Sequence, residues 1–147
     1  MKKIITFLLF GIFLITNIGN LAFAAKKSSG GISDGQITSM NACVDRLTEK
    51  IYSHSYFSPS DASSLIGIKI KLDDAMLMSP DPRYAILYYK IGRIYQKRGR
   101  KDEAIECYQT IMENFVDTAL APRAGMALKA LGVSVSIPKS GGGDEEE

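Results

Sequence analysis

The chain has few of the residues that most metal and catalytic sites require. Its 147 residues include one histidine, His54, and two cysteines, Cys43 and Cys107. A zinc site built on histidine and cysteine needs about four ligands, so these three residues do not supply one. The sequence also has no CxxC, HExxH or EF-hand pattern. The composition therefore predicts no metal site, no cofactor and no catalytic residue.

The remaining candidates for catalysis are weak. A hydrolase triad would have to use His54, which stands at the expected end of a helix, where a histidine is usually a favourable cap. Asp73 and Asp74 are adjacent on a helix and point apart by about 100°, which makes a poor acid and base pair. The glycine runs lie near the two ends and do not lead from a strand into a Lys-Ser/Thr helix start. We expect that the chain is not an enzyme.

The N-terminus has the pattern of an export signal. Lys2 and Lys3 precede an apolar run over residues 4–15, and Ala22 and Ala24 are the small residues that a signal peptidase requires. The pattern predicts a signal peptide of residues 1–24 and an exported protein, periplasmic or secreted, with no stable membrane span after cleavage. The alternative is an uncleaved anchor, because residues 4–24 are just long enough to cross a bilayer.

The charge of the chain argues against a nucleic-acid partner. Cleavage after Ala24 would remove two of the 18 basic residues and none of the 16 acidic ones, which leaves equal numbers. Four of the acids are the last four residues, Asp144 to Glu147. An exported chain that is neutral overall lacks the basic excess of nucleic-acid-binding proteins.

The apolar periodicity predicts five helices joined by short loops. Steps of three and four residues recur along each segment, as in the first one, with Ile37, Met40, Val44, Leu47, Ile51 and Tyr52. Ser33 with Gln36 fits a capping box, Ser58 with Pro59 marks a second start, and Gly99 is a typical helix terminator. Ile66 to Leu72 alternates as a strand would, but the longer helical pattern outweighs it. The expected helices are 34–55, 59–78, 81–99, 102–115 and 118–131.

The segments outside these helices are polar or rich in glycine. Residues 25–33 are expected to be a flexible leader, and residues 133–147 a disordered acidic tail that begins with an extended strip, 133–137. No linker divides the body, residues 34–132. Cys43 and Cys107 leave three alternatives open: an internal disulfide, an intermolecular one, or two buried thiols.

The segment 85–118 resembles the tetratricopeptide repeat, a unit of 34 residues that forms two antiparallel helices. It reads AILYYKIGRIYQKRGRKDEAIECYQTIMENFVDT. The matching residues are Tyr88, the Ile91-Gly92 pair, Tyr95, Gly99, Ala104 and Tyr108. Ile111 and Val116 depart from the pattern, which usually has alanine and proline there. Leu72 to Pro82 resembles the end of a degenerate earlier repeat, and residues 114–132 the start of a later unit or a terminal solvating helix.

The resemblance implies an all-α fold, a short right-handed superhelix of about five antiparallel helices. Gly92 and Ala104 would be small because the paired helices cross closely there. An array of about two and a half repeats is marginal, because each repeat buries its apolar face against neighbours. We therefore expect exposed apolar surface on the first or the last helix, and the chain could form a homo-oligomer.

The resemblance also implies a groove lined by the first helix of the repeat. The lining residues would be Ile86, Tyr89, Lys90, Arg93, Gln96 and Lys97. Three of them form a basic stripe suited to an acidic segment or a C-terminal carboxylate. The simpler alternative is a solvated face. The acidic end, 144–147, could occupy this groove in its own or a neighbouring molecule.

The sequence thus favours a non-catalytic scaffold or adaptor in the bacterial cell envelope, which binds a partner protein in a basic groove. The alternative function is a self-assembling structural subunit of a surface or envelope machine. An adaptor would bind through the stripe, whereas a structural subunit would associate through apolar helix faces.

Overall fold

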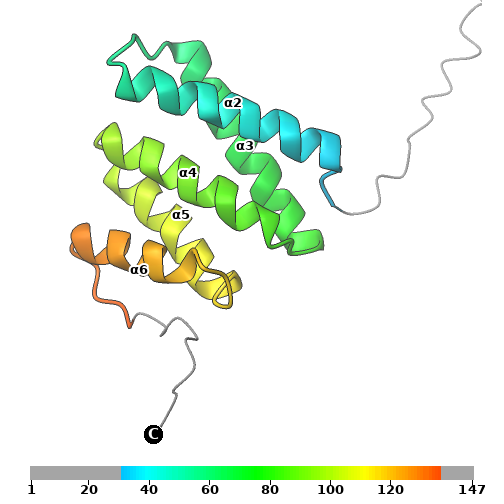
Figure 1. Cartoon of the computed structure of the whole chain (residues 1–147), viewed down its shortest axis with the longest axis vertical. Helices are drawn as coiled ribbons and strands as arrows, with labels where there is room; N and C mark the ends of the chain where they lie inside the picture. Colours follow the sequence, from blue (N-terminus) through cyan, green and yellow to red (C-terminus); the bar gives the residue numbers. More distant parts are fainter. Residues whose placement is uncertain (1–30, 137–147) are drawn as a thin grey trace, which may run out of the picture.

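The fold is all-α over the part of the chain that the computed structural model describes, residues 31–136. This part forms five helices and no strand (Figure 1). The predicted signal peptide, 1–24, and the acidic end, 144–147, lie outside the described residues. No helix within residues 31–136 has the length and apolar character needed to cross a membrane. The helices are α2 (Asp34–Tyr52), α3 (Pro59–Met78), α4 (Arg83–Lys97), α5 (Lys101–Asn114) and α6 (Ala121–Ala130).

The helix starts follow local capping chemistry. The Ser33 hydroxyl accepts from the Gln36 backbone N–H while the Gln36 side chain accepts from the Ser33 N–H, which confirms the predicted capping box. Ser58 and Asp61 form a second reciprocal pair at the start of α3. The Asp81 carboxylate accepts from the backbone N–H of Arg83 at 2.9 Å and so caps α4 from two residues upstream.

The helix ends differ slightly from the sequence expectations. The first helix ends at Tyr52 instead of Ser55, because His54 has a φ of +54° and the helix cannot continue through it. Gly99, with a φ of +71°, ends α4 as predicted. The last helix begins at Ala121 and not at Thr118, since the chain turns through residues 116–120 before Pro122 enters the first helical turn. Residues 66–72 are helical throughout, despite their alternating pattern.

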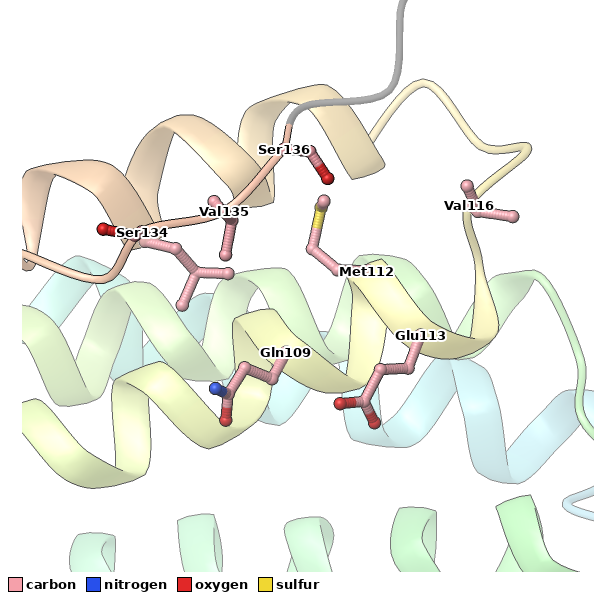
Figure 2. A pocket seen from close by; sticks show the side chains of 8 residues that line it. Gln109, Met112, Glu113, Val116, Ser134, Val135 and Ser136 are labelled. Atoms are coloured by element: carbon pink, nitrogen blue, oxygen red, sulfur yellow. The ribbon is translucent and has the colours of Figure 1, made fainter.

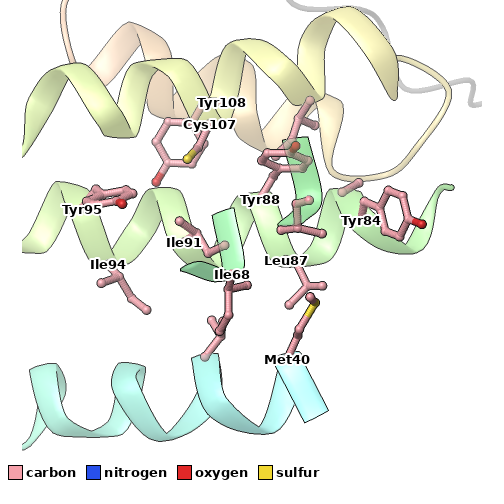
Figure 3. Packing of buried hydrophobic residues seen from close by; sticks show 14 of the residues in the cluster. Met40, Ile68, Tyr84, Leu87, Tyr88, Ile91, Ile94, Tyr95, Cys107 and Tyr108 are labelled. Atoms are coloured by element: carbon pink, nitrogen blue, oxygen red, sulfur yellow. The ribbon is translucent and has the colours of Figure 1, made fainter. Parts of the chain in front are cut away.

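The helices pack mainly against their neighbours along the chain. In Figure 1, α2, α4, α5 and α6 follow one another down the molecule, with α3 behind α2 and α4. The α4 helix is central, because it packs against α2, α3 and α5, and α6 then packs on α5. Since α4 separates α2 from α5, the core consists of two contact layers on the two sides of α4 (Figure 3).

Tyrosines fill the core around the crossing of α4 and α5. Tyr84, Tyr88 and Tyr108 are each at most 1% exposed and are among the largest fully buried side chains. Gly92 lies against this ring system, because a Cβ added there would come within 2.8 Å of Cε1 of Tyr108. Ala104 is fully buried on α5. The close approach of the two helices predicted at Gly92 is therefore present.

A partly exposed polar cluster connects α3, α4 and α5. The Lys69 ammonium donates to Asp73 and to Glu106, each at 2.8 Å, and the Tyr88 hydroxyl donates to Asp73 at 2.7 Å. Burial alone would lower the pKa of Lys69, but the two carboxylates outweigh it and raise this pKa. The cluster joins three helices through ion pairs between one ammonium and two carboxylates.

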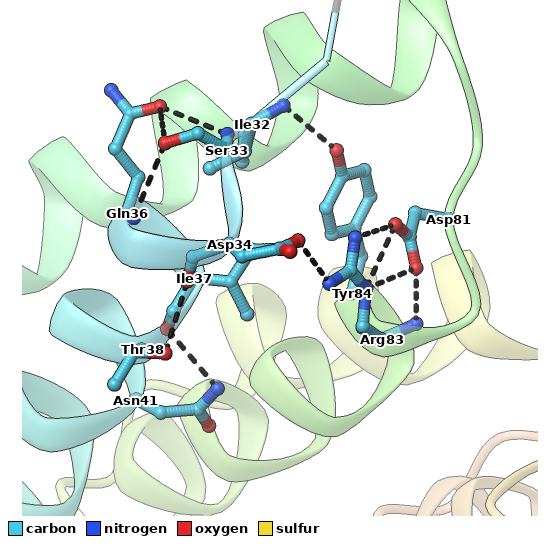
Figure 4. Close-up of polar contacts among 10 residues, drawn as sticks. All are labelled: Ile32, Ser33, Asp34, Gln36, Ile37, Thr38, Asn41, Asp81, Arg83 and Tyr84. Carbon is cyan, nitrogen blue, oxygen red and sulfur yellow. Dashed lines mark hydrogen bonds and ion pairs between the residues drawn. The ribbon is translucent and has the colours of Figure 1, made fainter.

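The start of α2 and the residues before it are also held against α4. The backbone N–H of Ile32 donates to the Tyr84 hydroxyl at 3.1 Å, and Arg83 forms ion pairs of 2.6 Å with Asp34 and with Asp81 (Figure 4). The hydrogen bonds from Arg83 lower the pKa of Asp81. Ile32 and Ser33, which the sequence assigns to the leader, therefore belong to the helical body.

The exposed apolar surface differs from expectation in its position. The expectation placed it on the first or the last helix, yet the largest concentration lies on α3. The residues are Leu77 at 87% exposure, Met78 at 72%, Ile70 at 54% and Ile66 at 48%. Sequence periodicity found the buried stripe of α3 but did not show that the opposite side would also be apolar and uncovered.

Candidate binding surface between helices α2 and α4

The six predicted groove residues divide between two sides of α4. Tyr89 and Gln96 turn toward α5, where the Tyr89 and Tyr108 rings lie 5.8 Å apart and the Tyr108 hydroxyl donates to Gln96 at 3.0 Å. Burial raises the pKa of Tyr108, so its hydroxyl stays a donor. Tyr89 and Gln96 are themselves half-buried. The other four, Ile86, Lys90, Arg93 and Lys97, follow one another by steps of three and four residues and thus share the outer side of α4.

Lys90 has partners on α2. Its ammonium lies 2.7 Å from the Asp45 carboxylate and 3.3 Å from the Asn41 side-chain oxygen. The carboxylate neutralises this charge locally, and the contact joins α2 to α4. Lys90 is therefore first a link between helices, a role that the sequence did not suggest.

Arg93 and Lys97 converge on a single aromatic ring across the same helix pair. The Arg93 guanidinium carbon and the Lys97 ammonium each lie 5.7 Å from the ring centroid of Tyr52, the last residue of α2. Arg93 also donates a hydrogen bond to the Tyr52 hydroxyl. Both basic side chains are exposed, and within residues 31–136 neither forms an ion pair with a carboxylate. Two uncompensated positive charges are thus held side by side on a rigid aromatic support.

The α2 residues of this surface were missed by the sequence reading. Tyr52 was assigned to the inward apolar set, whereas it is 47% exposed and faces α4. Asn41, Asp45 and Tyr52 fall on one side of α2 at steps of four and seven residues. That polar periodicity was the available signal, and it was overlooked because the apolar stripe of the same helix is stronger.

A further link between α2 and α3 was also missed. The Asp61 carboxylate, in a residue only 4% exposed, accepts from Lys50 at 2.8 Å and from Arg46 at 3.5 Å, and both cations belong to α2. The hydrogen bonds from Lys50 and Ser58 hold its pKa well below the usual range. This ion cluster holds the end of α2 to the start of α3.

Both cysteines are free thiols in the structure. Cys43 is half-buried on α2, with its sulfur 3.8 Å from a guanidinium nitrogen of Arg46. Cys107 is fully buried on α5, and burial raises the pKa of its thiol to about 12. The internal disulfide that the sequence left open is not formed, because α4 separates the two helices that carry the cysteines (Figure 3).

A cavity of about 620 Å³ lies elsewhere, between the second half of α5 and the segment that follows α6 (Figure 2). Its walls are mostly apolar and small polar groups, with one carboxylate and no basic side chain. They are formed by Gln109, Met112, Glu113, Val116, Leu128, Ser134, Val135 and Ser136. The predicted extended strip therefore begins at the edge of this cavity, where residues 133–136 form neither helix nor strand and the Val133 N–H donates to the Leu128 carbonyl.

Within the described residues no group of three or more His, Cys, Asp and Glu side chains could hold a metal ion. The comparisons with known proteins give no match, whether with protein-family models, with curated proteins or with solved structures. The geometry of the α2–α4 surface is therefore the main ground for a functional proposal.

Proposed function

We propose that this chain is a non-catalytic adaptor of the tetratricopeptide-repeat kind, which binds an acidic segment or a C-terminal carboxylate of a partner protein on its α2–α4 surface. We further propose that it works in the bacterial cell envelope, because the pattern over residues 1–24 is that of an export signal. The residues that would contact the partner are Ile86, Arg93 and Lys97 of α4, together with Tyr52 of α2.

The repeat assignment is supported by the α4–α5 hairpin. Segment 85–118 spans this hairpin almost completely, and a three-residue turn that contains Gly99 connects its two helices. Gly92 and Tyr108 meet at the crossing, as the spacing of the repeat requires. The packing of α6 on α5 and of α2 on α4 is consistent with neighbouring units stacked on this hairpin.

The observation that carries the binding proposal is the convergence of Arg93 and Lys97 on Tyr52. A guanidinium and an ammonium held together bind a carboxylate through charge-assisted hydrogen bonds, and the Tyr52 hydroxyl adds a neutral polar group. Ile86 is 47% exposed on the same side of α4, so an apolar side chain of the partner has a contact there. Lys90 contributes less, because Asp45 already neutralises it.

The test is capture of partners from an envelope extract with the chain and with an Arg93→Glu/Lys97→Glu variant. The matched control is Arg123→Glu/Lys129→Glu, which makes the same change in net charge on the exposed side of α6. We expect a partner that the chain and the control retain and the first variant loses. Its C-terminal peptide should then bind as the free acid at least tenfold more tightly than as the amide, or its acidic segment should bind in isolation.

Equal capture by all three proteins would contradict the proposal, because the stripe would then be a solvated face. Loss in the control as well as in the groove variant would show that net charge alone controls the association.

A further inference from the structure

The α3 helix is apolar on two opposite sides. Leu65, Ile68 and Leu72 are buried against the rest of the domain, whereas Ile66 and Ile70 are about half exposed. Exposed isoleucine and leucine side chains on a second side leave apolar surface in water, which a covering partner would remove. In residues 31–136 nothing covers the second side of α3.

The uncovered apolar residues form a stripe along one side of α3, which Asp73 interrupts between Ile70 and Leu77. Ile66, Ile70 and Leu77 follow by steps of four and seven residues, which return to nearly the same side of an α-helix with 3.6 residues per turn. Leu77 is 87% exposed, the highest value among the large hydrophobic residues of the described part. Gly67 lies beside the stripe with open space around its Cα, so no side chain there would hold a second helix away.

The charges beside the stripe are self-complementary. Lys71 and Asp74 are exposed, lie on the same flank of the stripe, and form no ion pair within the described residues. If two copies of α3 pack antiparallel about a two-fold axis, Lys71 of each copy faces Asp74 of the other, so the pair forms twice. Asp73 falls within the stripe, three residues after Ile70 and four before Leu77, and Lys69 of the same helix compensates its charge.

We propose that α3 forms the interface of a two-fold symmetric homodimer in which the Ile66, Ile70 and Leu77 stripes of two copies pack antiparallel. The apolar residues of the two stripes supply most of the contact, and the Lys71–Asp74 pairs set its register at the rim. This inference goes beyond the proposed adaptor function and does not depend on it.

The dimer has a consequence for binding that does rest on the proposed function. The stripe lies on the side of α3 opposite to the buried residues Leu65, Ile68 and Leu72, so the α2–α4 surface stays open in both copies. One particle then presents two binding surfaces, and a partner with two acidic segments would be held by avidity.

The first test is sedimentation velocity of the full chain. The chain is expressed with its own N-terminal segment and is purified after any cleavage of that segment by the cell. Reducing conditions exclude a disulfide through Cys43. We expect a dimer at micromolar concentration and a monomer for Ile70→Lys, with at least a tenfold weaker association and an unchanged circular dichroism spectrum. Met126→Lys, at a residue 57% exposed on α6, is the matched control and should stay dimeric.

The second test uses charge reversal to determine the arrangement. Lys71→Glu alone and Asp74→Lys alone each place like charges opposite one another at two positions, so each should weaken the homodimer about tenfold. A mixture of these two variants should form a heterodimer, because the glutamate introduced in one chain then faces the lysine introduced in the other, and the two unchanged side chains still face each other with opposite charge. A parallel arrangement predicts no such recovery.

Several results would overturn the proposal. One is a monomer for the unchanged chain at up to hundreds of micromolar, including a monomer that binds lipid vesicles through the same stripe. Another is a dimer that persists in folded Ile70→Lys, which would place the interface on another face. A third is the absence of a heterodimer in the mixture of charge variants, which would exclude the antiparallel register.

Discussion

The two helical hairpins of this protein are held together by different means. In the α4–α5 hairpin the helices approach closely at Gly92, where the Tyr108 ring and the Cys107 Cβ lie directly against the glycine. The α2–α3 hairpin has much less direct contact between its helices, and the buried Asp61 carboxylate with Lys50 and Arg46 joins their ends. Close packing determines how α4 and α5 lie together, whereas an ion cluster determines how α2 and α3 do.

This difference explains where a repeat pattern could be recognised. Close packing constrains residue size at fixed spacings, so small and aromatic residues recur at predictable positions in segment 85–118. An ion cluster constrains only the charges at one end of the hairpin, and it leaves the middle of each helix free to vary. The same freedom allows α3 to carry isoleucine and leucine on its outer side.

The largest expected difference between the hairpins is the reactivity of their cysteines. Burial between α4 and α5 raises the pKa of Cys107 to about 12, whereas Cys43 on α2 is partly exposed. At pH 8 a thiol of pKa about 12 is a thiolate on the order of one part in 10⁴, and burial also keeps the reagent away from the Cys107 sulfur. We expect iodoacetamide to label Cys43 at least a thousandfold faster than Cys107 in the folded chain, as mass spectrometry of the peptides would show.

A Cys43→Ser variant provides the control for this experiment. It should take up no label when folded and one label per chain in denaturant. Rapid labelling of Cys107 in the folded variant would mean that the α4–α5 contact opens readily, and that shape does not hold this hairpin firmly.

The helix boundaries and the α4–α5 core could be predicted from sequence because their causes are local. Ser33, Ser58 and Gly99 act within a few residues of themselves, and the apolar period identifies the buried side of each helix. The position of Tyr52 could not be obtained this way, because it depends on cations that lie about 40 residues further along the chain. The binding surface was therefore predicted on α4 and missed on α2.

The α3 helix shows a second limit of the sequence. Its periodicity identifies the buried row, Leu65, Ile68 and Leu72, but does not show that the apolar residues of the other side stay uncovered. Exposed apolar residues do occur on the first and last helices, at Tyr52 and Met126, but the largest group lies on α3. Asp61 is a similar case, since its position in the first turn of α3 does not show that it is an almost fully buried ion-pair centre in the fold.

The next effect, in order of size, is the opposite response of the two hairpins to the same substitution. Gly92→Ala places a Cβ 2.8 Å from Tyr108 and 3.2 Å from Cβ of Cys107, so overlap should outweigh the gain in helix propensity and cost about 1–3 kcal/mol. Gly67→Ala on α3 meets no atom within 4 Å and should stabilise by about 0.5–1 kcal/mol. Urea unfolding at low protein concentration measures both. If Gly67→Ala lowered the free energy of unfolding as much as Gly92→Ala does, the distinction between the two hairpins would not hold.

The smallest expected effect concerns the ion pair that joins the two hairpins. Lys90 and Asp45 lie 2.7 Å apart, but their side chains are 31% and 58% exposed, so solvent screens the pair and a double-mutant cycle should give a coupling of about 0.2–1 kcal/mol. The same pair has a second role under the proposed function, because Asp45 competes with an acidic partner for the Lys90 ammonium.

Asp45→Asn should therefore lower the free energy of unfolding slightly and raise the affinity for an acidic partner a few-fold. Urea unfolding and peptide binding on one preparation measure the two effects. Lys90→Met should lower both the free energy of unfolding and the affinity for the acidic partner. If Asp45→Asn instead weakened partner binding, the carboxylate would be a contact of the partner, and the bound segment would have to be basic at that position.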